Sequence, residues 1–287
     1  MYHSSLPTAS VSSLVTFFYQ MRQNAMPQDQ HGELLMPSGT GILGIHLQGR
    51  YEVSAWPFFQ GRLPRIYLIG QQTTSYRLKV FQEDADIFGV ALRPMAIWRL
   101  TRKPAHLFSN KPTPIPQVFD QNLIEKLETI PGVQSFEERI RLATELIEEL
   151  QAQMDLTKTL VDHALDLIFE EKGCISTREL CKQLHVSERH LQHLFRQQVG
   201  VSPLQYARIT RFNSIFVEFT RAEEPRDLPF LTSFFNYYDA SHFFKDFRVY
   251  SGESPSQFHL EKFALLKELV ENQPYLTQVQ ASAKNPK

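Results

Sequence analysis

The sequence predicts an α+β multidomain protein, in which an N-terminal all-β barrel or sandwich precedes an all-α domain with two helix-turn-helix motifs. Three observations lead to this prediction. Short apolar or alternating runs, divided by Gly, Pro and polar clusters, fill residues 40–108 and are typical of strands. One pattern of 17 residues occurs twice, 52 residues apart, which indicates a repeated helical unit. A chain of 287 residues is also long enough for two domains.

Four segments between residues 41 and 94 carry the β prediction. They are GILGIHLQGRYEV, RIYLIG, YRLKVF and DIFGVALRP. Aromatic residues near these segments could line a pocket, although each one alone is more often an ordinary core residue. The aromatic residues concerned are Trp56, Phe58, Phe59, Tyr67, Tyr76, Phe81 and Trp98.

No metal, cofactor or catalytic residue is predicted. His31, His46 and His106 lack the spacing of metal ligands, and Cys174 and Cys181 form neither a metal motif nor a disulfide framework. The sequence has no nucleophile elbow and no phosphate-binding loop. We therefore expect that the chain is not an enzyme.

A proline-rich segment, KPTPIPQ at 111–117, predicts an extended connector after the β domain. A helix is expected at about 120–129, and Ser135 caps a longer helix with Glu138 completing a capping box. Apolar residues of the longer helix repeat as a heptad seam, which predicts a homodimer. The seam is too short to establish a coiled coil, and packing of the helix onto its own β domain is the open alternative. The candidate dimerisation residues are Ile140, Ala143, Ile147 and Leu150.

The first copy of the repeat, HLQHLFRQQVGVSPLQY at 190–206, completes a helix-turn-helix. Ser176 caps the expected first helix and Ser187 caps the second, which Gly200 ends. The turn needs a residue with positive φ, and His185 occupies that position. Two short helices joined in this way are typical of a motif that places its second helix in a DNA major groove.

The second copy, HFFKDFRVYSGESPSQF at 242–258, repeats these features. Its first helix is expected at 228–235, with Asn236 at the turn, Asp239 as cap and Gly252 as the end of the second helix. A helix over about 203–220, beginning with Ser202-Pro203, is expected to join the motifs.

Charge differs between the two motifs. The whole chain has 30 basic and 31 acidic residues, so its net charge gives no signal for nucleic acid. Residues 172–211 hold seven basic and two acidic residues, whereas residues 218–262 hold five and eight. Because attraction to phosphates needs cations near the duplex, the first motif is expected to supply most of the affinity.

Helical phase selects the side chains that would face the groove. In the first motif, the face opposite the buried leucines carries Arg189, Gln192, His193 and Arg196. Arginine reads guanine with two hydrogen bonds, and glutamine reads adenine. The alternative interpretation is a polar face that contacts solvent alone.

Residues 157–262 resemble the DNA-binding domain of the AraC/XylS family of transcriptional regulators. The segment FFNYYDASHFFKDFRVYSGESPSQF is similar to the second-motif consensus of that family. His185 and Asn236 replace the family's two turn glycines, and Thr232 replaces a small alanine, which could weaken the motif geometry. FGVALRPMAIWRL is similar to the cupin-like N-terminal domains of many such regulators. The resemblance implies a DNA-binding domain of seven helices.

The resemblance also implies which residues contact DNA. In the family, the positions two before and one and two after the buried leucine contact bases, and here these are Arg189, Gln192 and His193. The complete set expected to bind DNA is Ser187, Arg189, Gln192, His193 and Arg196 in the first motif, and Ser241, Phe244, Lys245 and Arg248 in the second.

These predictions divide the chain into four segments. Residues 1–118 form a β-rich domain expected to sense an effector, and residues 119–156 a helical linker with the dimerisation helices. Residues 157–262 form the double helix-turn-helix domain, and residues 263–287 a helical end with a disordered tail.

The expected function is that of a sequence-specific DNA-binding transcriptional regulator of the AraC type, modulated by a small molecule at the N-terminal domain. Its expected partners are double-stranded DNA, an unknown small-molecule effector, RNA polymerase and a second copy of the chain. The alternatives are a constitutive DNA-binding protein whose β domain only dimerises, and a cupin-type enzyme with a helical accessory domain. The sequence has no N-terminal targeting signal, and none of its apolar runs approaches the length of about 20 residues that spans a bilayer. We therefore expect no membrane contact and a cytoplasmic protein.

Overall fold

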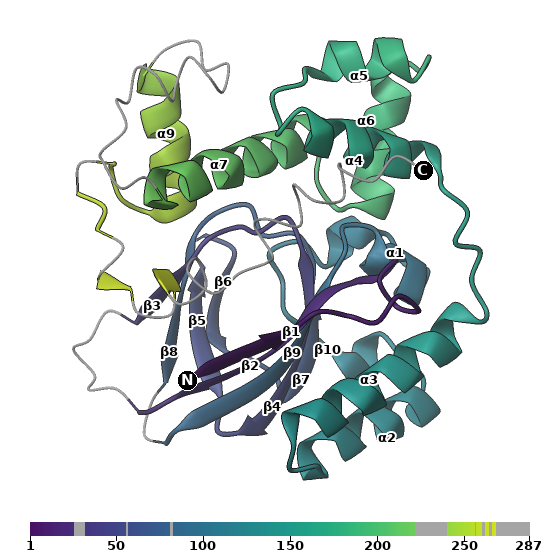
Figure 1. The fold of residues 1–287 in the computed structure, drawn as a ribbon, viewed down its shortest axis with the longest axis vertical. Coiled ribbons are helices and arrows are strands. Elements are labelled where there is room, and N and C mark those ends of the chain that lie inside the picture. The colour runs from purple at the N-terminus through teal and green to yellow at the C-terminus, as the bar shows by residue number, and fades with distance from the viewer. Residues whose placement is uncertain are drawn as a thin grey trace.

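The computed structural model describes residues 1–25, 32–55, 57–80, 83–221, 240–255, 257–259, 262–263 and 266–267, with side chains of the helix that ends at residue 221 described up to residue 216. Two antiparallel sheets form the N-terminal β domain, which confirms the predicted sandwich (Figure 1). The larger sheet has the strand order β1-β2-β9-β4-β7-β10, and the smaller has the order β3-β8-β5-β6. The strands are β1 Tyr2–Ser5, β2 Val15–Gln23, β3 Glu33–Leu35, β4 Gly41–Gln48, β5 Tyr51–Ala55, β6 Phe59–Arg62, β7 Ile66–Ile69, β8 Tyr76–Val80, β9 Ala85–Leu92 and β10 Thr113–Pro114.

All four predicted segments form strands, but the sheet extends well beyond them. The strand β2 was not expected, although it pairs with both β1 and β9 in the larger sheet. The prediction of a connector at 111–117 was wrong. Thr113 and Pro114 pair with β7 as an edge strand, and Ile115 is buried, so this segment belongs to the β domain.

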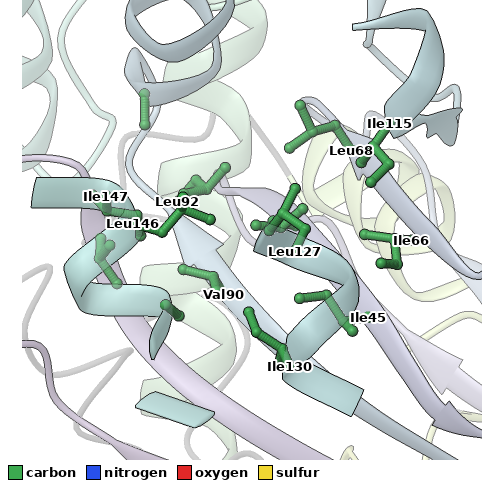
Figure 2. Packing of buried hydrophobic residues seen from close by; sticks show 14 of the residues in the cluster. Ile45, Ile66, Leu68, Val90, Leu92, Ile115, Leu127, Ile130, Leu146 and Ile147 are labelled. Carbon is green, nitrogen blue, oxygen red and sulfur yellow. The ribbon is translucent and has the colours of Figure 1, made fainter. Parts of the chain in front are cut away.

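Side chains of the larger sheet alternate between two apolar environments. In β9, for example, Phe88 and Val90 point to one face, while Ile87 and Ala91 point to the other. The face of Phe88 and Val90 packs against helices α2 (Gln121–Thr129) and α3 (Phe136–Gln151), as Figure 2 shows for part of this core. The opposite face points toward the smaller sheet, so each strand contributes to both interiors, as the period of two in a strand requires.

The helix α3 packs onto its own β domain, which corrects the prediction of a dimer seam. Its N-cap is the expected Ser135, whose side chain accepts a hydrogen bond from the Glu138 amide. Ala143 and Ile147 are fully buried in the core shared with the larger sheet, and Ile140 and Leu150 pack against that core. The apolar stripe of the helix is therefore covered within the chain and gives no support to a homodimer.

The predicted helical linker is likewise part of the N-terminal domain. Helices α2 and α3 share their core with the larger sheet, and residues 152–159 make the connection to the next helix. That next helix, α4, begins at Leu160 with Thr159 as its cap, in a capping box with Asp162.

The described helices of the C-terminal domain are α4 (Leu160–Glu170), α5 (Thr177–Gln183), α6 (Glu188–Gln198), α7 (Pro203–Arg221) and α9 (Ala240–Ser251). In Figure 1, α6 and α9 lie toward opposite ends of α7. The expected first helix of the second motif at 228–235, its turn residue Asn236, its cap Asp239 and the tail after residue 270 lie outside the described residues. No helix in the described ranges is long and apolar enough to cross a membrane.

Local signals of the first motif are confirmed. Ser176 and Ser187 accept hydrogen bonds from the amides of the third helical residues of α5 and α6. His185 in the turn has a φ of 53°, and Gly200 after α6 has a φ of 102°. A positive φ is costly for most residues, and His is among those that tolerate it best, so the sequence meets the requirement of the turn without glycine.

His46 in β4 is a buried structural histidine. Its Nδ1 lies 3.1 Å from the carbonyl oxygen of Pro64, to which it donates, and its Nε2 accepts the amide hydrogen of Tyr51 at 3.2 Å. Burial, which penalises the charged form, lowers the pKa of His46 from 6.5 to about 4. A proton on Nε2 would also oppose the Tyr51 amide, so the neutral ring fits this site.

This histidine predicts a loss of stability on acidification. The unfolded chain binds a proton at His46 below about pH 6.5, whereas the folded chain does so near pH 4. Stability should therefore fall by about 3 kcal/mol as the pH drops from about 6.5 to 4. Urea denaturation at several pH values gives the free energy of unfolding, which should depend less steeply on pH for His46→Gln than for the exposed control His163→Gln. Equal slopes for the two variants would mean that burial of His46 does not carry the pH dependence.

Candidate DNA interface and cavity

The helix α6 presents the predicted base-reading residues to solvent. Leu191 and Phe195 are buried in the core of the first motif, which turns the opposite face outward. The side chains exposed on or beside that face are Ser187, Arg189, Gln192, His193 and Arg196. Gln192 donates its amide to Glu188 at 2.9 Å, so reading an adenine with both amide groups would require this bond to open.

The helix α9 has the same organisation. Phe243, Phe247 and Tyr250 are buried against α7, while the expected DNA-binding residues Ser241, Phe244, Lys245 and Arg248 are exposed. The ring of Phe244 is directed outward and is 41% exposed. An outward aromatic ring suits contact with a thymine methyl group in the major groove.

An ion-pair cluster connects the recognition helix of the second motif, α9, to the joining helix α7. The carboxylate of Asp246 on α9 is buried and accepts a hydrogen bond from the Arg208 guanidinium on α7, while Arg211 lies 3.8 Å away. Two of the seven cations counted with the first motif are therefore engaged by an acid counted with the second. The contrast in free charge between the motifs is smaller than the sequence alone suggests.

A second feature is a cavity of about 160 Å³ between the two sheets. Strands of both sheets line it, as do the loop at 36–40, Asn213 and Phe216 of α7, and Leu266. Of the seven aromatic residues considered from the sequence, Phe59, Tyr67 and Tyr76 line the cavity.

The other aromatic candidates have different surroundings. Phe58 is half exposed, Trp98 packs against the core of the first motif, and Trp56 and Phe81 lie outside the described residues. Sequence reasoning missed Phe17, Tyr19 and Met21, which also line the cavity. The alternation of apolar residues in VTFFYQMRQ at 15–23 was the signal that could have found them.

The β domain contacts both motifs. Ser109 Oγ donates to the carbonyl of Gly200 at 2.9 Å, next to the end of α6. The Ser75 amide donates to the carbonyl of Val249 on α9 at 3.3 Å. Arg77 further lies over the ring of Phe263, with 5.6 Å between the guanidinium carbon and the ring centroid.

The cavity loop is linked directly to α7. The carbonyl of Gly39 accepts two hydrogen bonds, from the Tyr206 hydroxyl at 3.1 Å and from the Gln71 side chain at 3.1 Å. Gly39 has a φ of 79°, and an added Cβ would lie 3.3 Å from the Tyr206 oxygen. The Gly39 carbonyl therefore connects the loop at 36–40 to α7 beside the cavity.

Two family models match the chain. Residues 180–260 match a family described as a helix-turn-helix domain, and residues 3–114 match one described as a domain of unknown function (DUF6597). No curated protein sequence matches.

The chain is similar to several solved structures, at low sequence identity and with TM-scores below 0.5. ToxT from Vibrio cholerae O395 has a TM-score of 0.46 and 10% identity, over 92% of this chain and 98% of that chain. ToxT from Vibrio cholerae strain SCE256, bound to an unsaturated fatty acid, has a TM-score of 0.43 and 8% identity, over 83% and 92%. The AraC-like transcriptional activator CuxR has a TM-score of 0.22 and 16% identity, over 76% and 87%.

The chain therefore combines a two-sheet β domain with a C-terminal helix-turn-helix domain, the arrangement of a transcriptional regulator. The helix-turn-helix domain is of the AraC type, which confirms the resemblance seen in the sequence.

Proposed function

We propose that the chain is a sequence-specific DNA-binding regulator in which both motifs read one duplex and a small molecule in the cavity modulates binding. The observation that carries this proposal is the exposure of two recognition helices, α6 and α9, toward the two ends of one continuous helix. A rigid joining helix suits two motifs that enter successive major grooves.

The contacts of the cavity support the regulatory part of the proposal. The cavity is lined by Asn213 and Phe216 of α7 as well as by both sheets, so an occupant would touch the helix that joins the motifs. The loop at 36–40 lines the same cavity and is bonded to α7 through Gly39 and Tyr206. A ligand shifts an equilibrium only by its differential affinity for two states, and these contacts are where such a difference would arise.

Selection of bound sequences from a random DNA pool, with the full chain, tests the first part. Arg189→Ala and Gln192→Ala should each cost about 1–3 kcal/mol at one base position and leave the other positions unchanged. Arg196→Ala, at the edge of the same face, is expected to lower affinity for all sequences equally, as for a lost phosphate contact.

A uniform loss for Arg189→Ala and Gln192→Ala would place these side chains on phosphates. No sequence preference in the unmodified chain would overturn the proposal itself. If preference is present but no ligand alters it, the chain is a constitutive DNA-binding protein.

A further inference from the structure

The lining of the cavity restricts the charge of any ligand. Among the described residues that line it there is no Asp, Glu, Lys, Arg or His. Its polar groups are tyrosine phenols together with a few hydroxyl and amide side chains, and most of the wall is aliphatic or aromatic. A charged ligand would thus lose its hydration without meeting a counter-charge.

Two of the phenols form the floor of the cavity. In the larger sheet, Tyr19 of β2 is paired with Gly89 of β9, Gly89 with Gly44 of β4, and Gly44 with Tyr67 of β7. A Cβ added at Gly89 would lie 2.5 Å from the Tyr19 oxygen, and one added at Gly44 would lie 2.7 Å from the Tyr67 oxygen. The two rings therefore lie across two glycines that are paired with each other, in space that a side chain at either position would fill.

Tyr19 and Tyr67 differ from Tyr51, a third tyrosine of the cavity, in the hydrogen bonds of their hydroxyl groups. The Tyr51 hydroxyl lies 3.4 Å from the carbonyl of Met21 and 3.5 Å from that of Ala85, to which it donates. The described part of the chain offers no hydrogen-bond partner to the hydroxyls of Tyr19 and Tyr67, which line the cavity. Both residues line the cavity, so a ligand there could supply the hydrogen-bond partner that the described residues do not.

The phenols stay neutral at physiological pH. Burial raises the pKa of Tyr19, Tyr51 and Tyr67 above the ordinary value for tyrosine. The floor therefore offers neutral O–H donors and oxygen acceptors, not a phenolate that could pair with a cation.

We propose that the cavity binds a small, uncharged and largely apolar molecule, of the size of one substituted aromatic ring, that hydrogen-bonds to Tyr19 and Tyr67. The volume of about 160 Å³ is close to the about 150 Å³ of an engineered apolar cavity that takes benzene. This inference rests on the proposed function, since it names the ligand class of the same cavity.

Three probes of one shape test the ligand class: benzamide, benzoate and benzamidinium, which are neutral, anionic and cationic. Ligand-observed NMR on the full chain at millimolar probe concentration gives the three dissociation constants. Because burial of an unpaired charge is unfavourable, benzamide should bind about tenfold or more tightly than either ion. Binding of either ion as tight as that of benzamide overturns the proposal, and so does a failure of all three probes to bind.

Conservative variants locate the binding site. Tyr19→Phe and Tyr67→Phe keep the rings and remove the unpartnered hydroxyls, and each should weaken benzamide binding about threefold to tenfold. Tyr250→Phe makes the same change in a buried tyrosine on α9 outside the cavity, and should leave benzamide binding unaltered. Equal losses in all three variants, or none in the first two, would contradict the proposed contacts.

DNA binding by the same preparations keeps the two proposals apart. Sequence-specific DNA binding without preference for benzamide would reject the ligand class alone. Preference for benzamide without sequence-specific DNA binding would reject the proposed function, while the neutral ligand class would still hold.

Discussion

Replacing Ile147 by aspartate is expected to unfold the N-terminal domain and not to split a dimer. Ile147 is 3% exposed and packs in the core between α3 and the larger sheet. The substitution removes a buried aliphatic side chain, at a cost of about 2–5 kcal/mol, and adds the burial of a carboxylate without a partner. The total should exceed about 4 kcal/mol, a large part of the stability of a domain.

Urea denaturation followed by circular dichroism measures this loss. Glu148→Ala, on the exposed side of the same helix, is the matched control and should change stability by less than about 0.5 kcal/mol. If Ile147→Asp stays folded and sediments as a monomer while the unmodified chain sediments as a dimer, then the apolar stripe of α3 is an interface after all.

Replacing Asp246 by alanine is expected to uncouple the second motif from the first. The side chain of Asp246 is 4% exposed and lies between Arg208 and Arg211 of α7. Breaking a fully buried pair costs about 3–5 kcal/mol, and the cost here should be about 2–3 kcal/mol because the Arg208 side chain is 39% exposed to screening solvent. The second half of a DNA site should then lose protection before the first.

Two readouts test this expectation. Thermal unfolding should show the loss of stability, and a footprint should show weaker protection in one half of the site. Val249→Ala, on the exposed face of the same helix, should change neither the stability nor the balance between the halves. Equal weakening of both halves by Asp246→Ala would show that the ion pair supports the domain as a whole.

Features that depend on neighbouring residues in the sequence could be predicted. The caps Ser135, Ser176 and Ser187 and the positive φ of His185 follow from local backbone chemistry, and each is present in the structure. The strand segments between residues 41 and 94 were also found, because their apolar runs are bounded by breakers.

Features that depend on distant partners were missed. Thr113 and Pro114 pair with β7, which lies more than 40 residues earlier in the sequence. The composition of a proline-rich segment does not predict such a long-range pairing. The heptad spacing in α3 fits both a partner helix and a sheet, and only the fold selects the sheet. Likewise, charge counted along the chain did not foresee that Asp246 engages Arg208 and Arg211 of α7, which were counted with the first motif.

The residues that line the cavity could likewise be predicted from the sequence only in part. Tyr67 and Tyr76 were among the residues considered, but Tyr19 lies on a strand that the sequence analysis did not identify. The two phenol rings lie over Gly44 and Gly89, and only the strand register, which pairs these two glycines, brings the rings together.

The most direct test of the central claim is a hydroxyl-radical footprint of the full chain on its selected DNA. Two recognition helices joined by α7 predict one asymmetric site, protected in two successive major grooves about 34 Å apart. Protection of a single groove would mean that the second motif does not read DNA, and protection of a palindrome would mean that two chains each supply one motif. Either result would contradict the claim that both motifs of one chain read one duplex.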